Sequence, residues 1–136
     1  MRNWVDALPS DQIQFLSVDE TIAIHERLIE KFGGAPGIRD TGLLESALFR
    51  PQTGYYNDLA EMAAALFESL LLNHAFIDGN KRVAFFASDI FLRLNGWKFS
   101  VEAVAAYSFL MGMLEQGNCS YELLLPWIRN SIIETS

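Results

Sequence analysis

The chain has 136 residues, of which 51% are hydrophobic, and a formal net charge of −7. Its length and apolar content predict one compact domain, and its acidity argues against binding to nucleic acid. The single cysteine, Cys119, excludes an internal disulfide and is expected to be inert. No apolar run approaches about 18 residues, and the N-terminus lacks an apolar signal core. We therefore expect a cytoplasmic protein that neither enters a membrane nor is exported.

The first elements in the chain are an extension and a helix. Residues 1–15 are expected to form a loosely attached N-terminal extension, which precedes a domain over residues 16–136. Ser17 and Glu20 form a capping-box pattern, and apolar residues then recur at helical spacing until a Gly-Gly pair. This pattern predicts a first helix from about Val18 to Phe32. His25, with charged neighbours in that helix, is interpreted as a solvated surface residue.

Two further helices follow a loop that is rich in glycine. Asp40 or Thr41 can cap a short second helix, which Pro51 and Gly54 bring to an end. Arg39 and Asp40 fit a loop and cap better than a target-docking site. Asp58 is expected to cap a third helix that extends from Leu59 to about Asn73.

The remaining elements are also predicted to be helices. A fourth helix begins near Gly79, is apolar on nearly every side, and therefore belongs in the centre of a bundle. Ser100 is expected to cap a fifth helix over residues 101–114. Ser120 is expected to cap a sixth that Pro126 kinks or splits before it ends near Ile133. Since no alternating strand of convincing length is evident, we predict an all-α, compact single-domain bundle of about six helices.

Polar residues concentrate between the third and fourth helices, in the segment His74 to Arg82. Taken one at a time, they fit an ordinary turn, with an N-cap from Asp78 and a solvated Lys-Arg pair. Together they also fit an anion site, because the first turn of a helix offers free N–H groups and a positive dipole end. Gly79 would let an anion approach the backbone closely.

The side chains of this segment can supply the rest of a nucleotide site. Arg82 could grip phosphate oxygens in a bidentate manner, and Lys81 could add a point charge. Asp78 offers a hard oxygen ligand for the Mg²⁺ that accompanies a nucleoside triphosphate. His74 could take a proton from an attacking hydroxyl group. The spacing alone does not fix the distances among these groups.

The string HAFIDGNKR resembles the Fic motif, usually HPFxDGNGR, and more closely its Doc branch, in which lysine stands in the penultimate position. The resemblance extends over about residues 15–100. It implies a compact helical bundle and ATP with Mg²⁺ as cofactors. By position, His74 would be the general base, Phe76 a packing anchor and Asp78 the Mg²⁺ ligand. The phosphates would be held by Gly79, Asn80 and Arg82.

Two residues depart from the usual Fic motif. Ala75 replaces a proline, as is common in the Doc branch, and Lys81 replaces a glycine. Doc-like proteins with this lysine are thought to bind ATP in reverse and to phosphorylate elongation factor Tu. The resemblance therefore favours a toxin that phosphorylates a Ser/Thr hydroxyl of such a target and blocks translation. AMP transfer of the Fic type is the alternative, and a non-catalytic module that binds a nucleotide or peptide is another.

Many Fic proteins carry an inhibitory helix in which a glutamate obstructs the phosphate-binding arginine. Its pattern is Ser or Thr, three residues, Glu, then Gly or Asn, and this chain lacks it; the nearest string, Thr41 to Glu45, is followed by serine. A toxin without its own inhibitor needs a separate one, so a Phd-like antitoxin is the expected partner.

Overall fold

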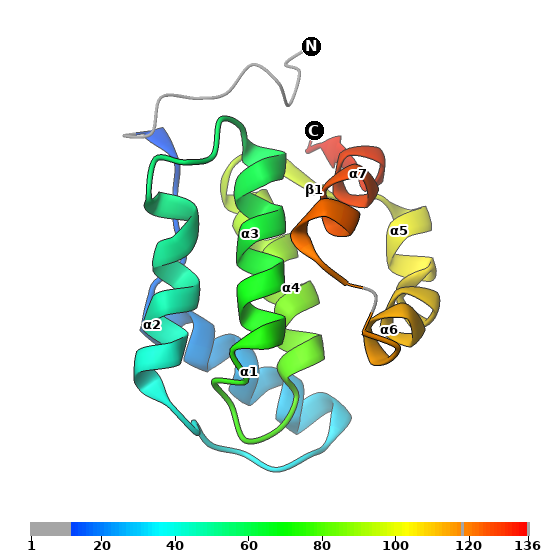
Figure 1. Ribbon diagram of the computed structural model, residues 1–136. Coiled ribbons are helices and arrows are strands. Elements are labelled where there is room, and N and C mark those ends of the chain that lie inside the picture. Colours follow the sequence, from blue (N-terminus) through cyan, green and yellow to red (C-terminus); the bar gives the residue numbers. More distant parts are fainter. Residues whose placement is uncertain (1–11, 118, 136) are drawn as a thin grey trace.

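The computed structural model describes residues 12–117 and 119–135; residues 1–11 of the expected extension lie outside it. In the described part the chain folds into seven α-helices, one 3₁₀ helix and two short strands (Figure 1). In chain order these are α1 (Val18–Phe32), α2 (Thr41–Phe49), η2 (Arg50–Gln52), α3 (Leu59–Leu72), α4 (Asn80–Leu94), β1 (Trp97–Phe99), α5 (Val101–Ala105), α6 (Tyr107–Glu115), α7 (Tyr121–Ser131) and β2 (Ile132–Glu134). The prediction of a compact helical bundle is confirmed.

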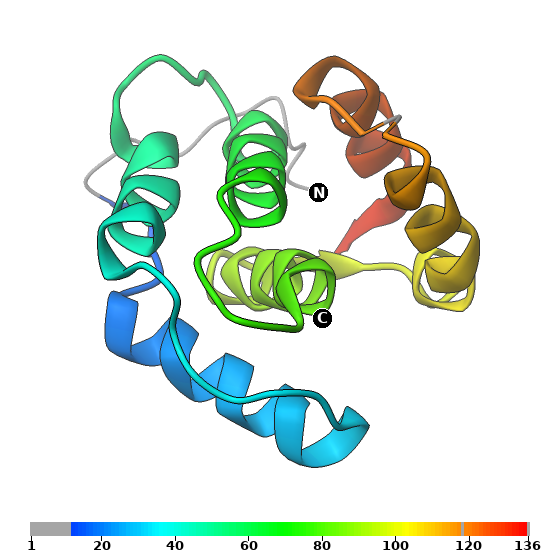
Figure 2. The ribbon, with the colours of Figure 1, turned by 60° about the horizontal axis from the view of Figure 1, so that its bottom comes forward.

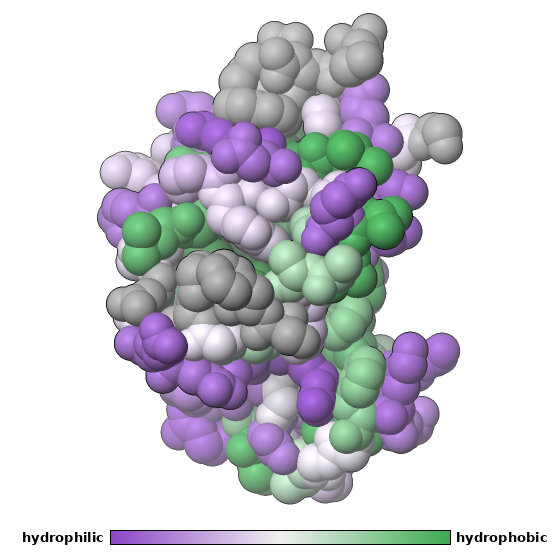
Figure 3. Space-filling view, turned by 90° about the vertical axis from the view of Figure 1, so that its right-hand side faces the viewer, coloured by the Kyte–Doolittle hydropathy of each residue, from purple (hydrophilic) through white to green (hydrophobic). Residues whose placement is uncertain are grey.

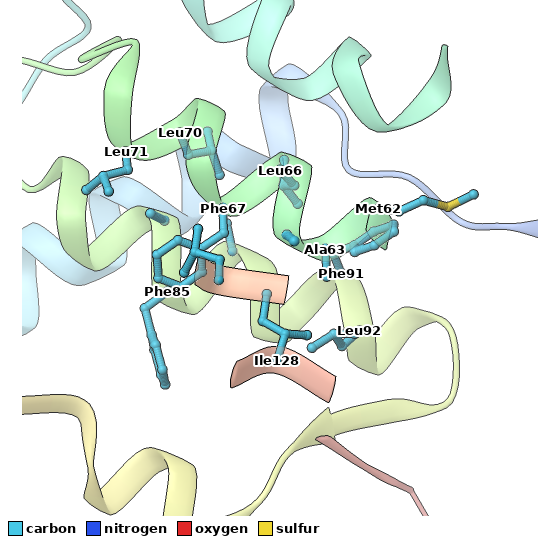
Figure 4. Close-up of a cluster of buried hydrophobic side chains, with 14 of the residues drawn as sticks. Met62, Ala63, Leu66, Phe67, Leu70, Leu71, Phe85, Phe91, Leu92 and Ile128 are labelled. Atoms are coloured by element: carbon cyan, nitrogen blue, oxygen red, sulfur yellow. The ribbon is translucent and has the colours of Figure 1, made fainter. Parts of the chain in front are cut away.

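Helices α3 and α4 form the centre of the bundle and pack against each other, with α1 and α2 on one side and α7 on the other (Figures 1 and 2). Apolar side chains from α3, α4 and α7 pack together between these helices (Figure 4). The fully buried ones include Leu66, Phe67, Phe85, Phe91 and Ile128. The expected central position of the fourth helix is therefore confirmed, and α3 shares it.

Four helix starts agree with the predicted caps. The hydroxyl of Ser17 accepts from the N–H of Glu20 at 3.1 Å, and the Glu20 carboxylate accepts from the N–H of Ser17 at 2.9 Å. Asp40, rather than Thr41, caps α2. Asp58 and Ser100 likewise accept N–H groups from the first turns of α3 and α5. Caps are predictable because the donor and acceptor lie within three residues of each other.

One helix prediction was wrong, and another was confirmed only in part. The expected single helix over residues 101–114 is interrupted at Ala106, which gives α5 and α6. Helix α7 begins after Ser120 as predicted and ends at Ser131, close to the expected end, but it is not split at Pro126. Its N-cap Ser120 makes no side-chain capping bond within the described residues. Burial of Leu124 and Ile128 against the bundle holds α7 together across the proline.

A small sheet was not anticipated from the sequence. Strand β1 pairs antiparallel with β2, with Lys98 opposite Ile133. Each strand has only three residues, and β2 forms where the sixth helix was expected to continue. The sheet joins the end of α4 to the end of α7 and so closes the part of the chain that contains α5 and α6 (Figure 1).

The segment before α1 contacts the bundle. Ile13 is buried, and Phe15 stacks on Phe91. The Asn95 side chain accepts from the N–H of Gln14 at 2.8 Å and donates to its carbonyl at 2.9 Å. The division of the chain after residue 15 stays a prediction. Across the described ranges, the helices are too short or too polar to cross a membrane.

Candidate active site

Two loops lie together at one end of the bundle: residues 33–40, between α1 and α2, and residues 73–79, between α3 and α4 (Figures 1 and 2). The N–H of Ile77 donates to the Gly37 carbonyl at 3.1 Å. The Ala75 carbonyl accepts from the N–H groups of Arg39 and Asp40 at 2.7 and 3.0 Å. These bonds fix the polar segment to the glycine-rich loop.

All six candidate residues line one pocket of about 530 Å³ beside the start of α4. They are His74, Asp78, Gly79, Asn80, Lys81 and Arg82, and Ile77 lies among them. The facing wall comes from α6 and consists of Tyr107, Met111 and Glu115. Hydrophilic and hydrophobic residues are interspersed on the side of the molecule that carries α5 to α7 (Figure 3). Because all six predicted residues line the same pocket, the fold brings them together in one concave site.

His74 is held by its backbone while its side chain remains exposed. It is the one residue other than glycine with a positive φ, 49°, in the described part of the chain. The Arg39 guanidinium donates to the carbonyls of His74 and Asn73, at 2.7 and 3.1 Å. Arg39 thus braces a backbone conformation that is uncommon for a histidine. An exposed imidazole on a fixed backbone can accept a proton from a bound hydroxyl group.

The Asp78 carboxylate accepts two backbone hydrogen bonds. The N–H of Ala35 donates to Oδ2 at 3.0 Å, and the N–H of Gly79 donates to Oδ1 at 2.8 Å. These bonds hold the pKa of Asp78 below its ordinary value, so the group is ionised at neutral pH. No cluster of three or more His, Cys, Asp or Glu that could hold a metal occurs among the described residues. One exposed carboxylate suits Mg²⁺, which usually keeps several oxygen ligands from water and phosphate.

Gly79 is the N-cap of α4 and has a left-handed backbone, with φ of 81°. Asp78 therefore does not cap this helix as the turn interpretation supposed, because its carboxylate faces the glycine-rich loop instead. A Cβ atom at Gly79 would have room, at 3.5 Å from the nearest atom, so the backbone angle is what requires glycine. The first turn of α4 lies on the pocket lining, where its N–H groups suit an anion.

The Asn80 side chain closes the loop. Its Oδ1 accepts from the N–H of Phe76 at 3.0 Å, and its Nδ2 donates to the Phe76 carbonyl at 2.9 Å. Phe76 is 1% exposed, in keeping with a packing anchor. Because both the oxygen and the nitrogen of its side-chain amide bond to Phe76, Asn80 would contact an anion through its backbone N–H.

The two basic residues of the segment make different contacts. Lys81 Nζ lies 3.2 Å from Glu115 Oε1. The Arg82 guanidinium lies over the Phe32 ring, 4.8 Å from its centroid. Burial raises the pKa of Tyr107, and the charge of Arg82 acts in the opposite direction. Both cations line the pocket and are partly exposed, so phosphate oxygens can reach them.

The prediction for His25 was wrong. This residue is 2% exposed, and its Nε2 lies 2.7 Å from the Asp78 carbonyl oxygen. Its ring stacks on Phe76 with centroids 4.0 Å apart. Charged neighbours in the sequence suggested a solvated face, but His25 follows the fully buried Thr21 by four residues and therefore shares its side of the helix. In the sequence, His25 lies three residues after Ile22 and three and four before Leu28 and Ile29, and this helical spacing from apolar residues is the signal that could have identified it.

Comparison with known proteins gives three matches. The Fic/DOC family model matches residues 15–92. "Toxin Doc" of Mycolicibacterium smegmatis is 45% identical in an alignment of length 76 that covers 52% of this chain and 58% of that protein. "Protein kinase doc" of Escherichia phage P1 is 35% identical in an alignment of length 88 that covers 62% of this chain and 70% of that protein. The chain therefore spans less than two thirds of the first relative. The family match includes the segment 74–82 and ends before α6.

Proposed function

Because the chain belongs to the Fic/DOC family, we propose that it is a toxin that transfers the γ-phosphoryl group of ATP to a Ser/Thr hydroxyl group of a target protein. The observation that carries this proposal is the gathering of a base, a carboxylate and a helix start in one pocket. The names of the two relatives, a toxin and a protein kinase, support the same class of activity.

In the proposed reaction the target hydroxyl oxygen attacks the γ-phosphorus of ATP. The bond from this phosphorus to the β,γ-bridging oxygen breaks, ADP leaves, and the hydroxyl proton passes to the imidazole of His74. The exposed position of His74 on the pocket lining supports this role. The Arg39 bonds to the backbone would keep the imidazole in place as the target binds.

The phosphates would lie at the start of α4, close to the backbone of Gly79 and Asn80. Arg82 and Lys81 would neutralise charge on the phosphate oxygens. The ionised carboxylate of Asp78 fits Mg²⁺, together with oxygens of the nucleotide. A bound Mg²⁺ would neutralise negative charge on the phosphate oxygens.

AMP transfer from the same ATP is the second candidate. AMP transfer needs room for a diphosphate beside the helix start, and the contact of the Lys81 ammonium with Glu115 directs this side chain toward α6. A non-catalytic module that binds a nucleotide or peptide is the weaker alternative, since binding alone does not require an exposed histidine and an ionised carboxylate in one pocket.

Label transfer distinguishes these functions. The purified chain, with Mg²⁺ and either γ-labelled or α-labelled ATP, is mixed with cell lysate and, separately, with purified elongation factor Tu, the target proposed from the Doc resemblance. Label from γ-labelled ATP alone supports phosphorylation, and label from α-labelled ATP supports AMP transfer. An absence of label from both nucleotides contradicts both transferase proposals and favours the binding module.

A separate inhibitor belongs to the same proposal. The chain lacks the inhibitory Ser/Thr-xxx-Glu-Gly/Asn pattern, so we propose that a Phd-like antitoxin inhibits it, through a C-terminal segment that folds on binding near the pocket. A cytoplasmic location is part of the same proposal and agrees with the single cysteine. Expression of the chain alone should arrest bacterial growth, and co-expression of the antitoxin should restore it. Harmless expression of the intact chain at a high level would count against both the toxin and its antitoxin.

A further inference from the structure

A second histidine lies directly beneath the candidate site. His25 of α1 is almost fully buried, and its Nε2 is 2.7 Å from the Asp78 carbonyl oxygen. A carbonyl can only accept, so Nε2 must carry the hydrogen and donate it. The ring is held in turn by stacking on Phe76, with an interplanar angle of 11°. His25 is therefore a fixed donor on a rigid helix.

Asp78 is held from two directions. Its carbonyl is bound by His25 from α1, and its carboxylate is bound by Ala35 from the glycine-rich loop. The Asp78 carbonyl belongs to the peptide bond between Asp78 and Gly79, and Gly79 is the N-cap of α4. The bond from His25 therefore also holds the start of this helix. A Cβ atom on Gly34 would lie 2.7 Å from Asp78 Oδ2, so the loop fits closely around the carboxylate.

We propose that His25 is a positioning residue for Asp78: its Nε2–H fixes the backbone that holds the carboxylate at the edge of the pocket, against the glycine-rich loop, and that starts α4. The role in transfer rests on the proposed function, whereas the role in placing Asp78 does not. His25 contacts Asp78 through the backbone and is absent from the pocket lining, so it acts through another residue. Buried groups that bind a metal-ligating residue, without touching the metal themselves, orient that residue toward the cation.

Two substitutions separate the donor from the ring. His25→Phe keeps an aromatic ring for Phe76 and removes the N–H, and His25→Gln keeps an N–H donor near the same place. Amide hydrogen exchange of Ala35 reports on Asp78 directly, because this N–H donates to its carboxylate. Leu43 is the matched reference, since its N–H donates to the Asp40 carboxylate at the same 3.0 Å.

In His25→Phe the Ala35 amide should exchange about tenfold faster, as expected for the loss of one hydrogen bond. The Leu43 amide should not change, and His25→Gln should restore protection at Ala35. Unchanged exchange in His25→Phe, or equal exchange in the two variants, overturns the proposal. If His25→Phe fails to fold, the imidazole ¹⁵N spectrum of the unmodified protein decides: a hydrogen on Nε2 supports the proposal and a bare Nε2 overturns it.

The catalytic consequence is measured separately. The Mg²⁺ concentration for half-maximal label transfer should rise about tenfold in His25→Phe and return to within about threefold of the unmodified value in His25→Gln. If the unmodified chain transfers no label, the proposed function fails, while the exchange of the Ala35 amide still decides whether His25 positions Asp78. An unchanged Mg²⁺ requirement together with faster Ala35 exchange overturns the catalytic part alone.

Discussion

Lys81 and Glu115 form an ion pair that joins the two walls of the pocket, with 3.2 Å between Nζ and Oε1. Lys81 is the second residue of α4, and Glu115 is the last residue of α6. Their side chains are 45% and 65% exposed, so solvent screens the attraction, and the pair contributes about 1 kcal/mol at most. A phosphate that binds Lys81 must therefore compete with the Glu115 carboxylate, whose attraction for Lys81 is weak.

Removal of this carboxylate should tighten ATP binding. In Glu115→Gln the Lys81 ammonium is released, and the Kd for ATP should fall by up to about fivefold at low salt. The gain should shrink as salt is raised, because the pair is exposed. Titration calorimetry measures both effects. Glu122→Gln, an exposed glutamate on α7 outside the pocket lining, should leave the Kd as it is. Equal affinities for ATP in the Glu115 variant and the unmodified chain would contradict the competition.

Lys81 should also decide which group is transferred. In Lys81→Gly the space beside the helix start opens, so phosphoryl transfer should fall and AMP transfer should appear. Mass spectrometry of the intact target distinguishes the two products. Lys81→Gln, which keeps most of the stem without the charge, should reduce phosphorylation without AMP transfer. If the unmodified chain and Lys81→Gly add the same group, Lys81 has no influence on the nucleotide pose. If the unmodified chain already adds AMP, the kinase proposal is wrong.

His74→Ala should abolish transfer and growth arrest while the fold is retained. A general base contributes roughly 10²–10⁴ in rate, and the exposed side chain adds little to the core, so the free energy of unfolding should change by less than about 1 kcal/mol. Label transfer and thermal unfolding check the two parts. His74→Asn, which tolerates the left-handed backbone, is the companion variant and should be equally inactive. Growth arrest by well-expressed His74→Ala would sink the assignment.

Two neighbouring glycines give a matched test of the Asp78 environment. A Cβ atom at Gly34 would meet Asp78 Oδ2 at 2.7 Å, whereas a Cβ atom at Gly33 has nothing within 4 Å. Both have a positive φ, so either alanine variant should lose about 1–3 kcal/mol of stability from backbone strain. Only Gly34→Ala should also raise the Mg²⁺ requirement and speed the exchange of the Ala35 amide. Equal Mg²⁺ requirements in the two variants would show that the close approach has no role.

The sequence was informative wherever structure is decided locally. Ser17, Asp40 and Asp58 cap helices as predicted, since each bond spans three residues. The break at Ala106 and the strands β1 and β2 were missed. No glycine or proline lies within five residues of Ala106, and the two strands pair across more than thirty residues of intervening chain. Their short length leaves no alternating pattern to detect.

The candidate site shows the same division. A nine-residue string identified the residues of one wall, because the chemistry is concentrated in consecutive positions. The partners of those residues come from elsewhere in the chain: His25 from α1, Ala35 from the next loop and Glu115 from α6. Contacts of this kind depend on how helices pack, which the spacing of residues in one segment does not determine.

The two walls of the pocket come from different parts of the chain. The wall that carries His74 and Asp78 lies inside the stretch matched by the family, and the wall of Tyr107, Met111 and Glu115 lies outside it. The β1–β2 ladder fastens the second wall to the bundle by backbone bonds that do not depend on the side chains of α6. Substitutions on α6 can therefore change the second wall of the pocket and leave intact the hydrogen bonds that hold His74 and Asp78.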